Sequence, residues 1–218
     1  MPAAGKDGRT DNRIERGNQT RRLVLARTTQ IASVEGLEAL SLGRLATELS
    51  LSKSGVFALF GSKEELQLAT IRAAARIYVD QVIKPVQEVA PGIGRVLALC
   101  DTWLGYSEHR VFSGGCFFYS VTAEFDARTG PVHDALAKAR ANWFDFVEQT
   151  VEDAHAAGDL VPDADVPQLV FELTAFLDAA NADSVLRDDA ASYARAAKAV
   201  RTRLRTVAAD PSLLPDTR

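Results

Sequence analysis

Apolar residues recur at helical spacing along most of the chain, and no segment shows a convincing alternation with a period of two. Near the N-terminus the pattern predicts a helix from about Asn18 to Glu35, which Gly36 ends. A second, short helix is capped by Ser41. Its apolar stripe consists of Leu42, Leu45, Ala46 and Leu49. The sequence therefore predicts an all-α fold.

The segment from Ser52 to Leu66, SKSGVFALFGSKEEL, combines the whole of one short helix with the start of another. Ser52 can cap a helix that Gly61 then ends. Ser62 precedes the next helix, and Glu65 completes a capping box with it. We expect this fourth helix to continue until Pro85, because proline interrupts helical hydrogen bonding.

Two short helices held at a sharp angle by glycine and serine are typical of a helix-turn-helix. The second helix of such a pair presents its N-terminal side chains to DNA bases and its backbone donors to phosphates. Lys53, Ser54 and Gly55 keep that end small or flexible, and Lys53 and Lys63 bracket the segment with positive charge. A helical hairpin with a solvated lysine face is the alternative that this spacing allows.

Five helices fit the rest of the chain. The first begins near Ile93 and is apolar on more than one side, as its residues Val96, Leu97, Leu99, Cys100, Trp103, Leu104, Tyr106 and Ser107 show. The aromatic segment CFFYSVTAEF follows, and we expect it to pack inside the other helices. Gly130 and Pro131 then start a long helix that ends at Gly158. Its inward residues are Val132, Leu136, Ala139, Trp143, Phe146, Val147 and Thr150.

The last two predicted helices carry more apolar surface than one bundle needs. The first has a stripe that starts at Val166 and a second apolar flank at Phe171 and Ala175. The final helix is rich in alanine, which permits close approach of another helix. We therefore predict a homodimer in which these helices meet their copies. The predicted interface residues are Phe176, Ala180, Tyr193, Ala197 and Val200. In the alternative, both stripes complete the core of a monomer.

The composition indicates a folded protein with a localised positive region. The chain has 218 residues, of which 47% are hydrophobic, and a net charge of −4 that argues against coating nucleic acid or membrane with the whole surface. Residues 1–70, however, carry ten Lys and Arg against eight Asp and Glu. Residues 1–17 are predicted to form a flexible, mildly basic arm. Cys100 and Cys116 are expected to be reduced thiols, and no stretch resembles an export signal or a membrane span, so we predict a cytoplasmic protein.

Patterns that would indicate catalysis or metal binding are weak. GIGRVL at 92–97 lacks the third glycine and the preceding strand of a dinucleotide-binding motif. His109, His133 and His155 have no metal-ligand spacing, and Glu124 and Asp126 point in different directions on a helix. We therefore predict no catalytic residue, no metal and no cofactor. A helical enzyme and an adaptor that does not bind DNA are the alternatives, and DNA binding that falls steeply with salt would separate a regulator from both.

The segment Gly36 to Leu66, GLEALSLGRLATELSLSKSGVFALFGSKEEL, resembles the DNA-binding domain of the tetracycline-repressor (TetR) family of bacterial transcription regulators. The shared features are the glycine after the first helix, Leu-Ala in the second, Ser-Lys opening the third, and Phe followed by Ser-Lys-Glu opening the fourth. The sequence departs from the family at Phe57, where a tyrosine usually contacts phosphate. Ala58 and Leu59 also replace polar residues that are common there.

The resemblance implies a helix-turn-helix domain at 18–65, a ligand-binding and dimerisation domain at 66–208, and a C-terminal tail at 209–218. It implies a homodimeric repressor that binds a palindromic operator in double-stranded DNA and that a small-molecule effector releases. The residues implied for DNA binding are Arg44, Ser52, Lys53, Ser54, Gly55, Val56, Phe57 and Lys63.

The aromatic residues of the C-terminal domain are the expected lining of an effector pocket. Such pockets are mostly apolar with a few polar groups, so we expect a small and largely hydrophobic effector. The predicted lining residues are Trp103, Tyr106, Cys116, Phe117, Ser120, Asn142 and Trp143. The polar residues Tyr106, Ser120 and Asn142 are equally compatible with hydrogen-bonded core positions. An aromatic core without a cavity is the alternative.

Overall fold

The computed structural model describes residues 7–215, and it describes side chains from residue 15 onward. Within that range the β-type pairing is limited to one isolated bridge between Leu160 and Ala208, which confirms the all-α prediction. The elements are α1 (Asp7–Glu35), α2 (Leu42–Glu48), α3 (Lys53–Phe60), α4 (Lys63–Tyr78), the π-helix η1 (Val79–Ile83), α5 (Lys84–Gln87), α6 (Ile93–Glu108), α7 (Phe117–Thr122), α8 (Pro131–Ala156), α9 (Val166–Leu186), α10 (Ala191–Val207) and the 3-10 helix η2 (Pro211–Leu213).

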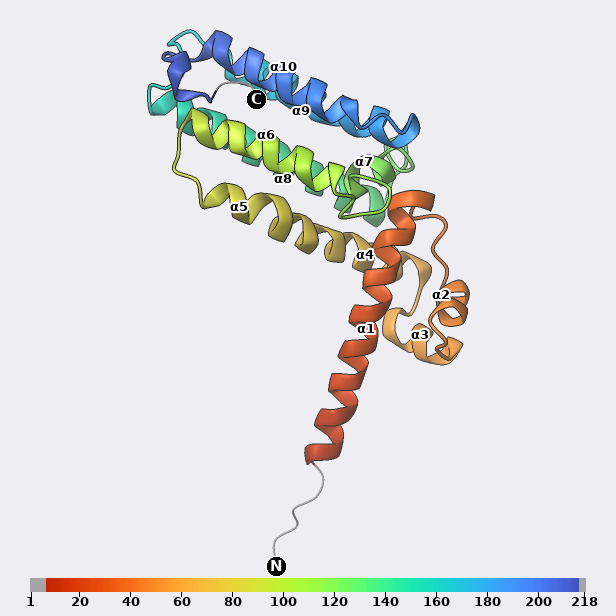
Figure 1. Cartoon of the computed structure of the whole chain (residues 1–218). Helices are drawn as coiled ribbons and strands as arrows, with labels where there is room; N and C mark the ends of the chain where they lie inside the picture. Colours follow the sequence, from red (N-terminus) through yellow and green to blue (C-terminus); the bar gives the residue numbers. More distant parts are fainter. Residues whose placement is uncertain (1–6, 216–218) are drawn as a thin grey trace, which may run out of the picture.

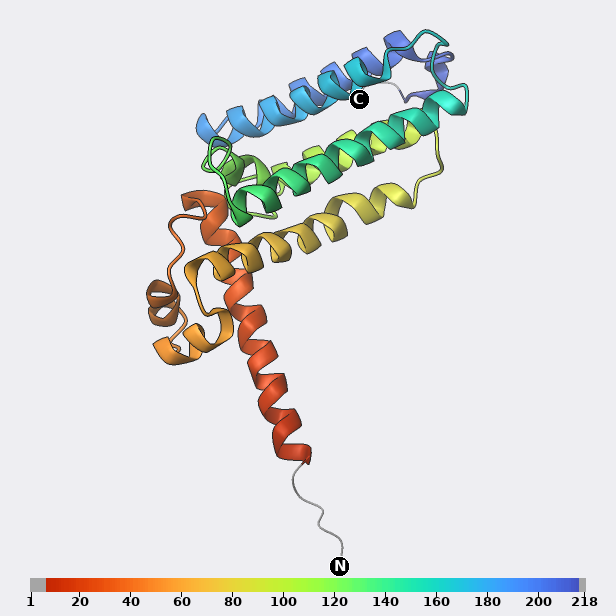
Figure 2. The same cartoon turned by 180° about the vertical axis from the view of Figure 1, so that it is seen from behind.

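The C-terminal helices stack in layers, and the N-terminal helices project from one end of the stack (Figure 1). Helices α9 and α10 form the outermost layer, α6 and α8 the next, and α4, η1 and α5 the third. Helix α1 extends away from the stack with α2 and α3 beside it, and Figure 2 shows the same separation from behind. We call α1, α2, α3 and the start of α4 the head, and the stacked helices the body.

Serine caps fix the starts of the three helices that follow α1, as predicted. The hydroxyls of Ser41, Ser52 and Ser62 each accept a hydrogen bond from the backbone N–H three residues further on. Gly61 ends α3 with a φ of 73°, a left-handed conformation that glycine adopts without strain. The caps satisfy backbone donors that the first turn of a helix leaves free, so they set where α2, α3 and α4 begin.

Helix α1 is longer than the sequence pattern predicts. It begins at Asp7 instead of near Asn18. The segment DGRTDNRIERG at 7–17 contains only one apolar residue, Ile14, so it has no apolar stripe that could reveal a helix. Residues 1–6 of the predicted arm lie outside the described range.

The helix that connects head and body contains one turn of π-helix. In η1 the N–H of Lys84 bonds to the carbonyl of Val79, five residues back. Pro85 follows directly, and it has no N–H and a ring that would clash with the carbonyl four residues before it. The wider π turn accommodates the proline without ending the helix. The prediction that this helix ends at Pro85 is therefore wrong, and the chain stays helical to Gln87.

The predicted helices of the body are confirmed. Helix α6 is buried on more than one side, and the aromatic segment forms α7, whose Phe117 is fully buried. Gly130 and Pro131 start α8, and Gly158, with a φ of 80°, follows its end. None of the helices in the described range combines the length and apolar character needed to cross a membrane.

The chain after α10 packs back on the body. The N–H of Ala209 donates to the carbonyl of Asp159, and Leu214 is buried. The predicted tail at 209–218 is thus ordered as far as residue 215, and residues 216–218 lie outside the described range.

Candidate functional site

The exposed side of α3 carries most of the residues expected to bind DNA. Lys53, Ser54, Gly55 and Phe57 are exposed at the surface of the head. Ser52 is exposed too, but its hydroxyl caps α3 by accepting the N–H of Gly55. Among the side chains that the structure describes, from residue 15 to 215, none forms a hydrogen bond or ion pair with the Lys53 ammonium, so this cation is available to a phosphate.

Val56 is a correction to the predicted set. Its side chain is fully buried in the core of the head, so it cannot reach DNA. Phe57 is the opposite case, because 58% of this large apolar residue is exposed. Beside it lies a shallow depression lined by Leu42, Gly43, Lys53, Ser54, Phe57 and Ala58. The depression between α2 and α3 is therefore lined mainly by apolar groups, with the positive charge of Lys53 among them.

Two other predicted DNA-binding cations are engaged by carboxylates. The guanidinium of Arg44 donates to both oxygens of Glu35, at 2.6 and 2.7 Å, and to Glu48 at 2.7 Å. These bonds lower the pKa of Glu35 and of Glu48. The ammonium of Lys63 donates to the Glu38 carboxylate at 2.8 Å, which lowers the pKa of that carboxyl. Glu48 lies one turn after Arg44 on α2, whereas Glu35 comes from the end of α1 and Glu38 from the turn after it. None of these pairings was predicted from the sequence.

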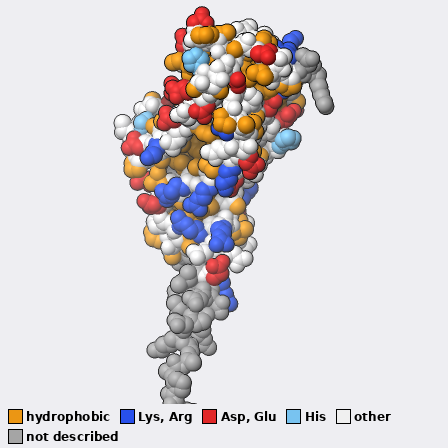
Figure 3. All heavy atoms as spheres, turned by 90° about the vertical axis from the view of Figure 1, so that its left-hand side faces the viewer, with side chains coloured by type: hydrophobic (Ala, Val, Ile, Leu, Met, Phe, Trp, Pro, Cys, Tyr) orange, Lys and Arg blue, Asp and Glu red, His pale blue; other side chains and the backbone are white. Residues whose placement is uncertain are grey.

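The distribution of charged side chains agrees with the predicted positive region near the N-terminus. Figure 3 shows Lys and Arg side chains gathered toward the end from which α1 projects, whereas Asp and Glu are more frequent toward the other end. A whole-surface attraction to a polyanion is not expected at a net charge of −4.

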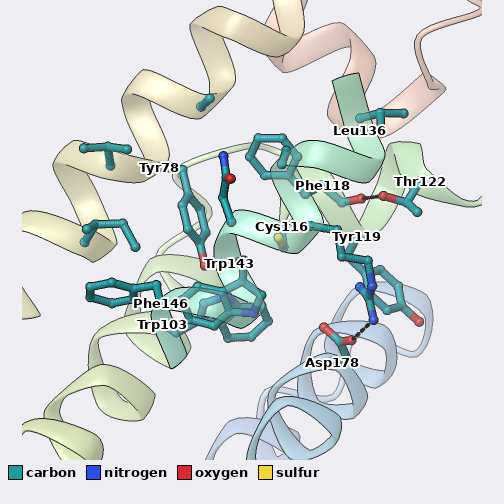
Figure 4. Close-up of a pocket in the computed structure, with 16 residues that line it drawn as sticks. Tyr78, Trp103, Cys116, Phe118, Tyr119, Thr122, Leu136, Trp143, Phe146 and Asp178 are labelled. Atoms are coloured by element: carbon teal, nitrogen blue, oxygen red, sulfur yellow. Dashed lines mark hydrogen bonds and ion pairs between the residues drawn. The ribbon is translucent and has the colours of Figure 1, made fainter. Parts of the chain in front are cut away.

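A cavity of about 300 Å³ lies inside the body, between the connecting helix and α6, α7, α8 and α9. Six of its sixteen lining residues are aromatic, and Figure 4 shows their rings around the cavity. The ring of Tyr78 stands edge-on to those of Phe118 and Trp143, with centroids 5.8 and 5.6 Å apart. The π turn forms part of one wall. The lining residues are Ala75, Tyr78, Val79, Ile83, Trp103, Cys116, Phe118, Tyr119, Thr122, Leu136, Ala139, Arg140, Asn142, Trp143, Phe146 and Asp178.

The charged groups of the cavity form a loose pair. The guanidinium of Arg140 lies 3.9 Å from the Asp178 carboxylate, beyond hydrogen-bond distance, and also lies over the ring of Phe144. Burial raises the pKa of Asp178, and the nearby Arg140 opposes that rise. Burial also raises the pKa of the Cys116 thiol to about 11, so this cysteine is a neutral, apolar wall residue at neutral pH.

Replacing Asp178 with asparagine should stabilise the protein at pH 7. A carboxyl with a raised pKa in the folded state holds its proton to higher pH than in the unfolded state, so it lowers stability as the pH rises through that window. We expect a melting temperature higher by about 1–3 °C at pH 7. Thermal melts should show this gain shrinking toward about pH 4, where the unfolded carboxyl protonates too.

The control is Asp145→Asn, which changes an exposed carboxylate on α8 and should not change the melting temperature. A lower melting temperature for Asp178→Asn at pH 7 would mean that the contact with Arg140 outweighs the burial of the carboxylate.

The structure places four of the seven predicted ligand-binding residues on the cavity wall, namely Trp103, Cys116, Asn142 and Trp143. The other three are corrections. The ring of Tyr106 packs 5.3 Å from that of Tyr78, behind the wall, and Phe117 is fully buried in the core. The hydroxyl of Ser120 donates to the carbonyls of Gly114 and Cys116.

Several wall residues were missed, including Tyr78, Phe118, Tyr119 and Phe146. The aromatic run before Glu124 was a signal for the α7 residues, but it does not show which ring faces the cavity and which faces the core. Tyr78 lies on the connecting helix, which sequence analysis did not include in the pocket.

The loops on both sides of α7 bind the end of α1. The Gln30 side chain accepts hydrogen bonds from the backbone N–H and the hydroxyl of Ser113, both at 2.8 Å, and donates to the carbonyl of Val111. The hydroxyl of Ser33 accepts the N–H of Gly114 at 3.1 Å. Since α7 is also a wall of the cavity, a movement of α7 there would be transmitted to α1 through these hydrogen bonds.

The loop after α7 holds the turn that follows α1. The carboxylate of Glu124 accepts the N–H of Glu38 at 3.1 Å, and Arg128 donates to the Glu38 side chain at 3.0 Å. Glu38 in turn binds Lys63 at the start of α4. Head and body are therefore joined by polar contacts on both sides of α7.

The outer face of α9 carries an uncovered apolar stripe. Phe171 is 64% exposed and Leu186 is 87% exposed, and the side chains between them on that face are alanines. The residues of this outer stripe are Phe171, Ala175, Ala179, Ala182 and Leu186. Their spacing of three and four residues places them on one side of the helix.

The predicted dimer residues are placed differently. Ala180, Tyr193 and Val200 are buried within the chain itself, and the hydroxyl of Tyr193 bonds to Ser107, Ser184 and Arg110 in an internal polar network. These three are corrections, because they have little surface to offer a partner. Phe176 on α9 and Ala197 on α10 are only partly buried, so each keeps some surface that a partner could contact.

Comparisons with known proteins agree on one family. A family model described as "Tetracyclin repressor-like, C-terminal domain" matches residues 92–200, half of the chain. The structure is similar to a TetR transcriptional regulator from Chloroflexus aurantiacus, with a TM-score of 0.82 and 21% identity, over 89% of this chain and 98% of that chain. A TetR-family regulator from Cytophaga hutchinsonii gives a TM-score of 0.79 and 18% identity, over 89% and 98%.

A third similar structure is that of AibR in complex with isovaleryl coenzyme A and operator DNA, with a TM-score of 0.67 and 17% identity, over 86% of this chain and 97% of that chain. At these identities the structural likeness establishes the fold. A comparison with curated proteins gives no match.

Proposed function

The chain belongs to the TetR family of transcriptional regulators, and from that premise we propose that it is a ligand-responsive repressor. It binds a palindromic operator as a homodimer, and a small, largely apolar effector releases it. The observation that carries this proposal is the aromatic cavity of about 300 Å³, because one of its walls, α7, lies between the two loops that hold the head.

The DNA-binding part of the proposal rests on the head. Its short helices α2 and α3 have the arrangement in which a second helix enters the major groove, and Lys53 is free at the exposed start of α3. AibR, which shares the fold, was solved in complex with isovaleryl coenzyme A and operator DNA. Reading a palindrome requires two heads related by a two-fold axis, and the outer stripe of α9 offers a surface for that pairing.

The effector part of the proposal rests on the cavity. Rings from α4, α6, α7 and α8 line it, and its polar groups are few, as expected for a small-molecule site. An effector that prefers one arrangement of α7 and the connecting helix shifts the heads, and DNA then weakens effector binding by the same factor. The π turn lies in the wall, where Val79 and Ile83 line the cavity, so an effector would contact the irregular segment of the connecting helix.

The family and the similar structures are transcriptional regulators, so an enzymatic role is not proposed. In the described range, no group of three or more His, Cys, Asp and Glu could hold a metal ion. We place the protein in the bacterial cytoplasm, where its DNA target lies.

Selection of bound sequences from a random duplex pool tests the proposal, and a palindromic consensus is the expected result. On that palindrome, Lys53→Ala should weaken binding by about 5–10-fold and reduce the salt slope by about one, because one phosphate contact is lost. Lys63→Ala is the matched comparison and should have a smaller effect, since Glu38 already neutralises that ammonium. Fluorescence anisotropy over a range of salt concentrations measures both.

Failure to enrich any sequence would contradict the proposal. A non-palindromic consensus would contradict the dimeric mode of reading while leaving DNA binding in place. Equal losses for Lys53→Ala and Lys63→Ala would show that Lys63 leaves Glu38 to bind phosphate.

A further inference from the structure

The reading surface of the head has few side chains that can form hydrogen bonds with bases. The segments of α2 and α3, LGRLATE and KSGVFALF, contain no Asn or Gln, and their one arginine, Arg44, is bound by Glu35 and Glu48. Thr47 donates to the carbonyl of Gly43, and Ser54 donates to the hydroxyl of Ser52. Bidentate recognition of guanine by arginine or of adenine by an amide therefore has no available residue on these two helices.

This surface instead exposes apolar side chains. Phe57 exposes 58% of its surface although it lies on the helix proposed to enter the major groove. The depression that Phe57 helps to line also has Leu42, Gly43, Ala58 and Lys53 in its lining. The positive charge of Lys53 suits a site that faces the phosphates of DNA, and the apolar lining suits a group without hydrogen bonds.

Thymine is the base that presents an apolar group in the major groove, its 5-methyl. We propose that this protein reads its operator through thymine methyl groups, which Phe57 and the depression between α2 and α3 receive. The proposal rests on the proposed DNA binding by α3 and goes further, because it names the base and the atom that are read.

Gly43→Ala tests the proposal, because it changes the depression without disturbing the fold. A Cβ added there would meet no atom of the protein within 4 Å, so alanine fits the fold. Alanine also favours a helix over glycine by about 1 kcal/mol, so Gly43→Ala should fold at least as well as the natural protein. The added methyl, however, occupies part of the depression. A loss of methyl recognition in this variant cannot then be attributed to unfolding.

The test replaces thymine by uracil, one position at a time, in the selected palindrome. Uracil keeps every hydrogen bond of the base pair and lacks only the methyl. We expect one or two positions per half-site at which the change weakens binding about fourfold, and about 15-fold when both half-sites are changed. In Phe57→Ala and Gly43→Ala the thymine and uracil duplexes should bind within about twofold of each other, and Gly94→Ala, with open space around its Cβ, should behave like the natural protein.

Equal binding of thymine and uracil duplexes by the natural protein would overturn the inference while leaving DNA binding proven. So would full thymine preference in Phe57→Ala and Gly43→Ala, which would place the methyl contact elsewhere. Absence of any DNA binding would overturn the inference together with the proposed function, and the selection experiment above identifies that case by itself.

Discussion

Glutamate in place of Phe171 is expected to convert the proposed homodimer to monomers. Phe171 is 64% exposed in the single chain, so a charge there does not disturb the core. In a two-fold symmetric pair of α9 helices, however, each substitution occurs twice and brings two carboxylates into an apolar contact. Burying unpaired charge in this way is strongly unfavourable. We expect the dissociation constant of the dimer to rise more than ~100-fold.

Sedimentation velocity at micromolar concentration measures the change, and binding to the palindrome should weaken in parallel because paired heads are lost. Leu213→Glu is the control, since Leu213 is 51% exposed but lies outside the outer stripe. It should remain dimeric. If Phe171→Glu and Leu186→Glu both stay dimeric, the interface lies on another surface of the body.

The sequence predicted the features that depend on neighbours along the chain. Serine caps at Ser41, Ser52 and Ser62 act within one helical turn, and apolar stripes report which side of a helix is buried. Neither needs knowledge of the packing between helices. The start of α1 was not predicted, because its polar segment has no apolar stripe from which a helix could be recognised.

The sites were predicted less well because they depend on how helices meet. Trp103 and Phe117 are both aromatic and both buried, yet only Trp103 borders the cavity. Tyr193 and Val200 belong to a regular stripe, but that stripe faces α9 and α6 of the same chain, so the outer stripe at Phe171 is the surface left uncovered. Hydrophobic periodicity shows that a face of a helix is buried. It does not show whether that face packs against the same chain or against a partner.

Charge was the least predictable property. Arg44 and Lys53 are both basic residues of the predicted helix-turn-helix, and the sequence treats them alike. Among the described residues, carboxylates of Glu35 and Glu48 pair with the Arg44 guanidinium, whereas none pairs with the Lys53 ammonium. Both groups are charged, but only that of Lys53 is unpaired and open to a phosphate. The pair Arg44–Glu48 is a local one, four residues apart on α2, and was open to prediction. The pairs of Arg44 with Glu35 and of Lys63 with Glu38 join different elements and have no such local signature.

Alanine in place of Gly114 is expected to uncouple the effector from DNA. A Cβ on Gly114 would lie 1.8 Å from the backbone carbonyl oxygen of Ser33, which cannot move aside as a side chain can. The loop before α7 must then separate from α1, and the contacts of Ser33 and Gln30 with that loop are lost. The α7 residues that line the cavity, Phe118, Tyr119 and Thr122, take no part in these contacts, so the cavity should stay available. The effector should still bind, but its binding should no longer release the palindrome.

The measurement needs two readouts on one protein. Trp103 and Trp143, the chain's only tryptophans, lie on the cavity wall, so their fluorescence should report binding of an effector found by screening for operator release. In the natural protein we expect the effector to weaken operator binding by about 5–150-fold, the usual range of allosteric coupling. In Gly114→Ala the fluorescence change should persist while this factor falls toward about one.

Gln30→Ala is the second variant, because it removes the hydrogen bonds to Ser113 and Val111 without inserting any atom, and it should lower the coupling partially. Gly94→Ala is the matched control, since its Cβ meets no atom within 4 Å. Should Gly114→Ala and Gln30→Ala both release the operator as the natural protein does, the signal would have to travel through α4 and its π turn alone. Coupling through the loops of α7 predicts the reverse, because those loops are where the body holds α1.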